Sequence, residues 1–245
     1  MNPSMKTIYS FALATTHCFL MLSVNAMAAD KPEFSLGGDV VSSYVWRGSQ
    51  VAGFEGINVQ PYASMDYAGF TLGAWASTNF EGDGKEVDFS LGYTLGGLSA
   101  TLTDYWFGGN YFRYGKETGT HTYEATLSYD FGEKLPLSVS WSTLLYGDDY
   151  KEDGSKRYSS YLELNYSTSL SDVDLTFTVG ASPWSSNWYH LDAEGDLKSG
   201  FQVNNIALTA AKEIKLTESF SLPLFGQVVF NPCQEDVHFV IGLSL

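Results

Sequence analysis

The feature that most constrains this chain is the alternation of apolar and polar residues, which recurs in segment after segment between residues 34 and 245. In the segment 236–245, for example, Val237, Phe239 and Ile241 occupy every second position. A strand with this period of two has one apolar face and one polar or small face. The pattern therefore predicts an all-β protein.

Twelve strands are predicted, and the segments that connect them are alternately short and long. The predicted strands are residues 34–47, 57–67, 70–80, 86–95, 98–107, 121–131, 137–146, 158–170, 173–182, 203–214, 219–230 and 236–245. Short connections such as Ala68-Gly69 and Gly96-Gly97 suit two-residue hairpin turns, whereas residues 108–120 and 183–202 form long loops. Transmembrane barrels alternate tight turns on one side of the membrane with longer loops on the other. We therefore expect a transmembrane antiparallel up-and-down β-barrel of about 12 strands, with both termini on the turn side.

A water-soluble barrel or sandwich would also alternate, but its apolar faces would point inward. Aromatic residues near both ends of the predicted strands favour a barrel in lipid, because such barrels carry aromatic belts at the two membrane interfaces. On the turn side these residues are Phe34, Tyr67, Phe70, Phe131 and Phe220, and on the loop side Tyr44, Trp46, Phe80, Trp106, Tyr123 and Tyr158. No stretch after residue 28 approaches the roughly 20 apolar residues of a membrane helix, so any spanning element has to be a strand.

The N-terminal segment has the features of a secretory signal peptide. Lys6 supplies a positive charge, an apolar run follows, and Ala26-Met27-Ala28 matches a cleavage site. We expect residues 1–28 to be the signal peptide and residues 29–245 to be a barrel in the outer membrane of a Gram-negative bacterium. After cleavage Cys233 is the only cysteine, which excludes an internal disulfide and a metal site built from several cysteines.

The charge balance bears on what the barrel could transport. The chain has 28 acidic and 13 basic residues, which argues against nucleic-acid binding. On the predicted inward faces, Arg47 is the one basic residue, and the acidic residues are Asp39, Asp66, Glu86, Asp88, Glu124, Asp130, Glu163, Asp174 and Glu213. Acid-lined pores select cations. Alternatively, these carboxylates pair with loop lysines or with neighbouring hydroxyl groups inside a filled lumen.

A barrel of about 12 strands is intermediate between small barrels filled by side chains and wide aqueous porins. Inward aromatic residues would narrow it further; these are Tyr62, Trp75, Tyr105, Tyr146, Tyr161 and Phe225. At the loop-side end of the first predicted strand, Arg47 is expected to bind Glu86 and Asp88, because a guanidinium can hold two carboxylates. The alternative is that Arg47 extends into solvent.

Residues with catalytic chemistry are few. His190-Leu191-Asp192 places a base beside a carboxylate but has no evident nucleophile, and an exposed loop histidine is usually only solvated. We predict no catalytic residue, metal or cofactor. Trp184, Trp188 and Tyr189 in the loop 183–202 could bind sugars or lipid headgroups, or could pack this loop into the mouth of the barrel.

Several short motifs resemble a bacterial family of TorF-like outer-membrane porins, which are conserved proteins of unknown function. The motifs are Ser43-Tyr44-Val45-Trp46-Arg47-Gly48, Gln60-Pro61, Gly73-Ala74-Trp75-Ala76-Ser77, Glu86-Val87-Asp88 and Gly92-Tyr93. The resemblance implies an outer-membrane barrel with a role in transport and brings no established substrate or site residue. Beyond these motifs it extends only through the strand rhythm.

The predicted function is therefore a narrow channel for passive passage of small solutes, with a preference for cations. Its expected partners are outer-membrane lipid, small solutes or ions, and the barrel-assembly machinery during export. The alternative is a barrel enzyme or a surface-binding protein that acts through its long loops. Conductance in a planar bilayer would discriminate between these two functions.

Overall fold

The computed structural model describes residues 31–80, 84–114, 119–218 and 220–245, and all of its regular elements are strands. The predicted signal peptide, residues 1–28, lies outside the described residues. The strands are β1 (Glu33–Val41), β2 (Val45–Trp46), β3 (Ser49–Gln50), β4 (Asn58–Tyr67), β5 (Phe70–Asn79), β6 (Lys85–Leu95), β7 (Leu98–Trp106), β8 (His121–Asp130), β9 (Leu137–Tyr146), β10 (Ser160–Leu170), β11 (Val173–Ser182), β12 (Gln202–Lys215), β13 (Ser221–Asn231) and β14 (Asp236–Ser244).

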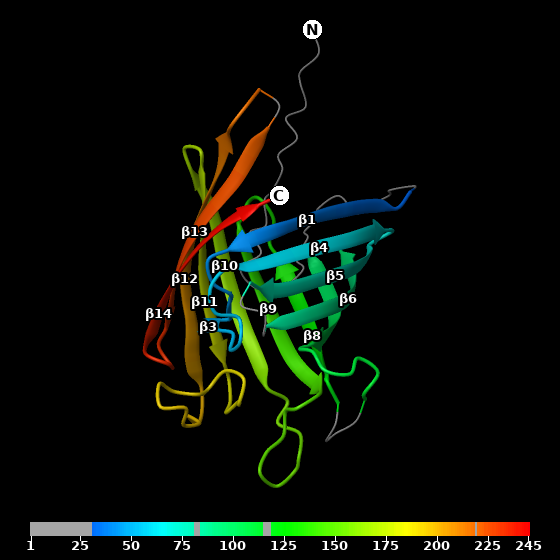
Figure 1. Ribbon diagram of the computed structural model, residues 1–245, viewed down its shortest axis with the longest axis vertical. Coiled ribbons are helices and arrows are strands. Elements are labelled where there is room, and N and C mark those ends of the chain that lie inside the picture. Colours follow the sequence, from blue (N-terminus) through cyan, green and yellow to red (C-terminus); the bar gives the residue numbers. More distant parts are fainter. Residues whose placement is uncertain (1–30, 81–83, 115–118, 219) are drawn as a thin grey trace.

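Twelve of these strands form a closed antiparallel up-and-down barrel, as predicted from the sequence (Figure 1). Each strand pairs with its neighbours along the chain from β4 to β14, and β1 closes the ring between β4 and β14. β2 and β3 pair only with each other and form a small separate hairpin.

The connections lie alternately on the two sides of the barrel, and the longest loops all lie on one side, which confirms the predicted wiring. The last connection on that side, residues 232–235, is short. Residues with positive φ occur in several of the tight turns, among them Ala68 and Gly69 between β4 and β5, Gly96 between β6 and β7, and Ser171 between β10 and β11. Such φ values give a twist that matches the flanking strands. The β12–β13 hairpin projects beyond the other turns, at the top of Figure 1.

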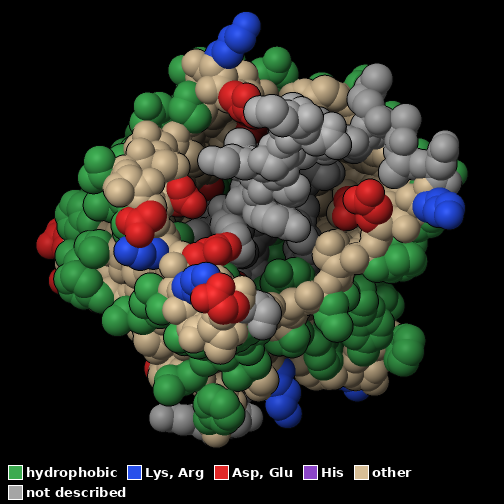
Figure 2. All heavy atoms as spheres, turned by 90° about the horizontal axis from the view of Figure 1, so that it is seen from above, with side chains coloured by type: hydrophobic (Ala, Val, Ile, Leu, Met, Phe, Trp, Pro, Cys, Tyr) green, Lys and Arg blue, Asp and Glu red, His purple; other side chains and the backbone are tan. Residues whose placement is uncertain are grey.

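The apolar faces of the barrel strands point outward. In β14, Phe239 and Ile241 are 71% and 64% exposed, whereas the intervening Val240 is 4% exposed. Polar side chains predominate among the buried residues that face inward. Seen from the turn side in Figure 2, hydrophobic side chains cover the outer wall and acidic side chains gather around the opening. The alternative of a barrel with an apolar interior and a polar exterior is therefore wrong.

Among the described residues, no helix combines the length and the apolar character that a membrane span requires.

The first predicted strand is wrong at its loop-side end. β1 stops at Val41 rather than at Arg47, and the chain then turns into the barrel to form the β2–β3 hairpin. Val45 of this hairpin packs inside the barrel against Val229 and Val240. We call residues 42–57 the inserted segment. Because this segment lies inside the mouth, Tyr44 and Trp46 are absent from the outer aromatic belt in which they were predicted.

A bulge changes the direction of one predicted lumen residue. The register between β8 and β9 shifts so that Tyr123 pairs with Tyr146 and Glu124 pairs with Leu144. Leu145 is therefore the extra residue. The rings of Tyr123 and Tyr146 are 5.5 Å apart, on the face opposite to Glu124. The prediction that Tyr146 narrows the lumen is thus wrong, whereas the four predicted lumen residues Trp75, Tyr105, Tyr161 and Phe225 are buried, and Tyr62 is half-buried.

The ring closes through a short seam. β1 pairs with β14 at three positions, from Asp39 with Ser244 to Val41 with Gly242, but with β4 at nine positions. At one end of the seam β1 leaves the wall after Val41, where the inserted segment begins, and at the other end Gly38 and Leu245 exchange two backbone hydrogen bonds. The amide of Ser42 still donates to the carbonyl of Ile241 at 2.8 Å, which anchors the start of this segment to β14.

Candidate functional site

The tip of the inserted hairpin is a two-residue turn at Arg47 and Gly48. Their φ values are 49° and 93°, and Trp46 pairs with Ser49 on either side. Positive φ at both central residues is the pattern of a type I′ turn. Glycine is also required at position 48 for steric reasons, because a Cβ there would overlap the backbone carbonyl of Asn204 on β12. The turn thus holds Arg47 against the barrel wall.

Arg47 forms a two-pronged ion pair with Glu124 on β8. Its Nη1 and Nη2 atoms donate to the two carboxylate oxygens at 2.6 and 2.8 Å. Nη1 also donates to the hydroxyl of Tyr189 at 2.5 Å, and Nη2 donates to Ser142 Oγ at 3.0 Å. Arg47 and Glu124 are only 3% and 1% exposed, so this is an ion pair in the interior of the barrel.

Aromatic rings enclose the guanidinium. Its Cζ atom lies 4.5 Å from the ring centre of Trp46, 4.6 Å from that of Tyr161 and 5.6 Å from that of Tyr189. The hydroxyl of Tyr105 donates to Glu124 Oε1 at 3.0 Å. These contacts compensate the loss of hydration that a buried ion pair incurs.

Both hypotheses for Arg47 from the sequence are wrong, because it binds neither Glu86 and Asp88 nor solvent. Those hypotheses placed Arg47 at the end of a strand in the barrel wall. The inserted segment instead carries it across the lumen to Glu124. Arg47 lies inside the barrel, in contact with one of the predicted inward acids, Glu124.

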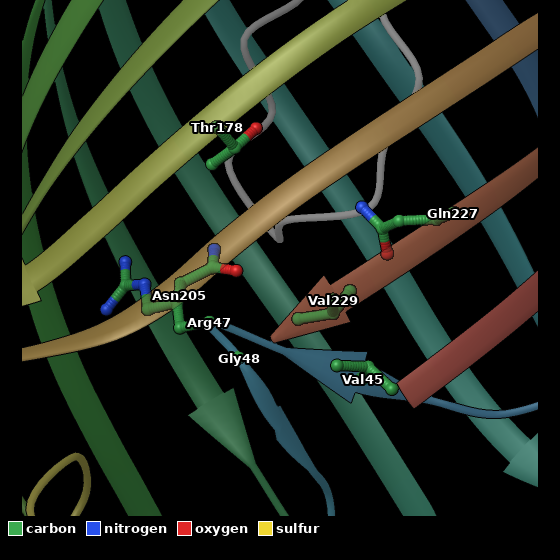
Figure 3. Close-up of a pocket in the computed structure, with 7 residues that line it drawn as sticks. All are labelled: Val45, Arg47, Gly48, Thr178, Asn205, Gln227 and Val229. Carbon is green, nitrogen blue, oxygen red and sulfur yellow. The ribbon is translucent and has the colours of Figure 1, made fainter. Parts of the chain in front are cut away.

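Little space remains beside the guanidinium (Figure 3). A cavity of about 10 Å³ is lined by Val45, Arg47 and Gly48 of the inserted hairpin together with Thr178, Asn205, Gln227 and Val229 of β11, β12 and β13. This volume holds about one water molecule. The hairpin therefore forms a constriction at this level of the lumen.

Hydroxyl and amide groups donate to two other inward carboxylates on the loop side, Glu86 and Glu163. Glu86 is buried and accepts a hydrogen bond from the hydroxyl of Tyr44 at 2.9 Å. Buried Asp88 has one oxygen, Oδ1, with no hydrogen-bond partner within the described parts of the chain. Glu163 accepts from Tyr161 and Asn165. Glu86 and Glu163 thus bind neighbouring hydroxyl groups, as the sequence analysis considered for acids in a filled lumen.

The other predicted acids lie apart from Arg47. Asp66, Asp130 and Asp174 are at the turn-side ends of their strands, where they accept hydrogen bonds from Thr71 Oγ1, the amide of Gly132 and Ser169 Oγ. Asp39 is buried beside Ser244 at the seam, and Glu213 is exposed near the β12–β13 turn. Of the predicted acids, the structure therefore brings Glu124 into direct contact with Arg47 and places Asp88 beside Glu86.

The long loop between β11 and β12 folds into the mouth, as one of the two sequence hypotheses predicted. Tyr189 is buried against Arg47, and burial raises the pKa of its phenol well above the usual value. Trp188 donates from Nε1 to the carbonyl of Asp148 at 3.2 Å. His190 was expected to be exposed but is fully buried, with its ring nitrogens near the carbonyls of Ser182 and Lys198. Burial lowers the pKa of this imidazole.

One polar pair on the outer wall was missed. Asp104 on β7 and His121 on β8 lie 2.8 Å apart, and Tyr111 and Tyr114 of the following loop contact the imidazole. The alternation in residues 98–107 places Asp104 on the outward face. A charged residue that breaks an apolar face is the signal that could have revealed this pair.

A closed 12-strand barrel with an acid-rich interior fits a channel or porin-like protein. No family model matches the sequence, and the comparison with curated proteins gives no match. In the described part of the chain, no group of three or more His, Cys, Asp or Glu side chains is placed to hold a metal ion.

Proposed function

We propose that this protein is an outer-membrane barrel that forms a narrow channel for small solutes, with a preference for cations. The outward apolar faces support insertion in lipid, because exposed apolar area on this scale needs a partner. The resemblance of residues 43–93 to TorF-like porins supports the same location and a role in transport.

The observation that carries the cation preference is the imbalance of charge in the lumen. Arg47 is the only buried Lys or Arg in the described residues, and Glu124 neutralises it. Asp39, Glu86 and Asp88 are also buried on inward faces. Carboxylates lining a pore attract cations and repel anions. The constriction at Arg47 implies that the wild-type conductance is small.

Recordings in planar bilayers test this proposal. The wild-type protein is compared with a variant in which residues 44–51 are replaced by a flexible Gly-Ser linker of equal length. We expect a small cation-selective conductance for the wild type, read from the reversal potential in a KCl gradient, and a larger one for the linker variant. Inserted barrels of both proteins that carry no current would overturn the proposal.

A second candidate function is supported by one observation, a cavity of about 370 Å³ at the loop-side mouth. It favours the alternative of a surface protein that binds a ligand through its loops. Ligand binding by barrels that never conduct would establish this alternative.

A further inference from the structure

The cavity at the loop-side mouth is separate from the small space beside Arg47. Its volume of about 370 Å³ is within the range of small-molecule sites, roughly 300–1,000 Å³. Its walls come from the inserted segment, the start of β6, Phe107 directly after β7, and the β9–β10 and β11–β12 loops. The lining residues are Tyr44, Trp46, Ser49, Gln50, Val51, Glu86, Phe107, Asp148, Asn187 and Trp188.

Four of these residues give the cavity aromatic walls. The ring centres of Trp46 and Trp188 are 6.0 Å apart, with an angle of 74° between the planes, and Phe107 lies 6.0 Å from Trp188. Tyr44 is held from behind by Phe54 at 5.1 Å and by Trp75 at 5.7 Å. The hydrogen bonds of Tyr44 to Glu86 and of Trp188 to the Asp148 carbonyl fix two of the walls. The site is therefore formed before a ligand arrives.

The lining is acidic. Its described residues include the carboxylates of Glu86 and Asp148 but no Lys or Arg. Glu86 is buried, and the neighbouring Asp88 has an oxygen without a partner among the described residues. Arg47 stacks on Trp46, but Glu124 neutralises its charge. An anion is disfavoured here, whereas a bound cation would stabilise the ionised form of Glu86.

Aromatic rings together with carboxylates recognise a particular kind of cation. Ring faces attract alkylated ammonium groups, which are weakly hydrated and apolar at their surface. A small inorganic ion would instead need several oxygen atoms converging at close range. We propose that this cavity binds a small organic cation with a quaternary or alkylated ammonium group. Binding needs only the folded barrel, so this inference goes beyond the proposed channel and does not depend on conduction.

Choline is a suitable probe, because its neutral isostere 3,3-dimethyl-1-butanol has the same shape without the charge. The full-length protein in a nonionic maltoside detergent is titrated with each compound by calorimetry and tryptophan fluorescence. We expect choline to bind at least about tenfold more tightly than the neutral isostere and than K⁺. Equal affinities for choline and the isostere, or for choline and K⁺, would overturn the proposal.

Two variants locate the site. Glu86→Gln, which can still accept the hydrogen bond from Tyr44, and Trp188→Leu should each weaken choline binding by about tenfold. Asp153→Asn is the matched control, because Asp153 is an exposed acid in the same loop as Asp148 and does not line the cavity. The heat-dependent mobility of the barrel in gels verifies folding. Unchanged binding in both folded variants would contradict the assignment.

A third titration distinguishes a free cation from a lipid headgroup. Phosphocholine carries the same ammonium group with a phosphate, which the carboxylates of Glu86 and Asp148 should repel. Weaker binding than that of choline is expected, and tighter binding would overturn the assignment to a free cation. A barrel that conducts ions but fails to bind choline would contradict this inference and leave the channel intact.

Discussion

At the scale of single residues, the ion pair of Arg47 and Glu124 dominates the interior. Both partners are nearly inaccessible, so replacing one leaves the other as an uncompensated buried charge. Arg47→Ala should lower the free energy of unfolding by about 3–5 kcal/mol, measured by urea denaturation in lipid vesicles. It should also shift the reversal potential toward greater cation selectivity, because the one buried positive charge is lost.

Two controls separate this effect from a general sensitivity to mutation. Lys151→Ala removes an exposed cation from a loop and should leave stability within about 0.5 kcal/mol of the wild type. The double replacement Arg47→Met with Glu124→Met removes both charges and should cost less than Arg47→Ala alone. If the double variant lost as much free energy of unfolding as Arg47→Met and Glu124→Met lose together, the two charges would not interact.

The sequence alone could place Arg47 on an inward face but could not identify its partner. Alternation in a strand determines which face a side chain occupies, and Arg47 was the one basic residue on those faces. Glu124 is 77 residues away along the chain, and the pairing depends on how far the hairpin reaches across the lumen. The reach of the hairpin across the lumen cannot be inferred from a local sequence pattern.

At the scale of elements, the docking of the β2–β3 hairpin depends on Gly48. Gly48→Ala should destabilise the barrel and expose residues 42–57 to protease, because the new Cβ would meet the Asn204 carbonyl. Gly53→Ala is the matched control: its φ is also positive, but nothing lies within 4 Å of the added Cβ. Both replacements incur the left-handed strain of about 1–2 kcal/mol. Equal protease sensitivity of the two variants would argue against tight docking at Gly48.

The loop between β11 and β12 should loosen in acid, because His190 is buried. Burial lowers the pKa of this imidazole below its ordinary value of 6.5. The unfolded loop therefore binds a proton at a higher pH than the packed loop, and the stability present above pH 6.5 decreases as the pH falls. Proteolysis of residues 183–201 should be faster at about pH 5 than at about pH 7.5. In His190→Asn this pH dependence should disappear, and its persistence would implicate another group.

The inserted segment also shows why one element was predicted incorrectly. The alternation of residues in β1 continues beyond the end of the strand through Tyr44 and Trp46, so the sequence predicted one long strand. Residues of a hairpin inside a lumen contact other parts of the protein on both faces, and such contacts need no change in local pattern. The bulge at Leu145 was invisible for a similar reason, since a single extra residue alters the register without altering composition.

At the scale of the whole molecule, the separation of an apolar exterior from a polar interior can be tested in β6. Leu91 faces outward and is half-exposed, whereas the adjacent Ser90 faces inward. In a lipid bilayer, Leu91→Lys should lower the free energy of unfolding by about 2–4 kcal/mol, because a charge near the midplane is costly. Ser90→Lys places the same group among lumen carboxylates and should cost less. The reverse order, measured by urea denaturation in vesicles, would contradict insertion in this register.

The fold class could be predicted from sequence because period-two alternation and the lengths of the connections are both local properties. Eleven of the twelve predicted strands match β4 to β14 to within a few residues. The direction of the apolar faces was harder, because a soluble barrel alternates equally well. The aromatic belts favoured the membrane, although Tyr44 and Trp46, counted among them, lie inside the mouth.

The short seam between β1 and β14 has a consequence for the order in which the barrel forms. From β4 to β14, each strand of the wall pairs with the next strand along the chain. β1 pairs with β4, although the inserted segment separates these two strands in the sequence. At the seam the bond between Ser42 and Ile241 joins residues 199 positions apart. Bringing such distant segments together loses much chain entropy and makes closure the slow step of folding. Until closure, β1 and β14 each have an unpaired edge that can bind a strand of another chain. Formation of the three pairs between β1 and β14 therefore ends the period in which the protein is most prone to aggregate.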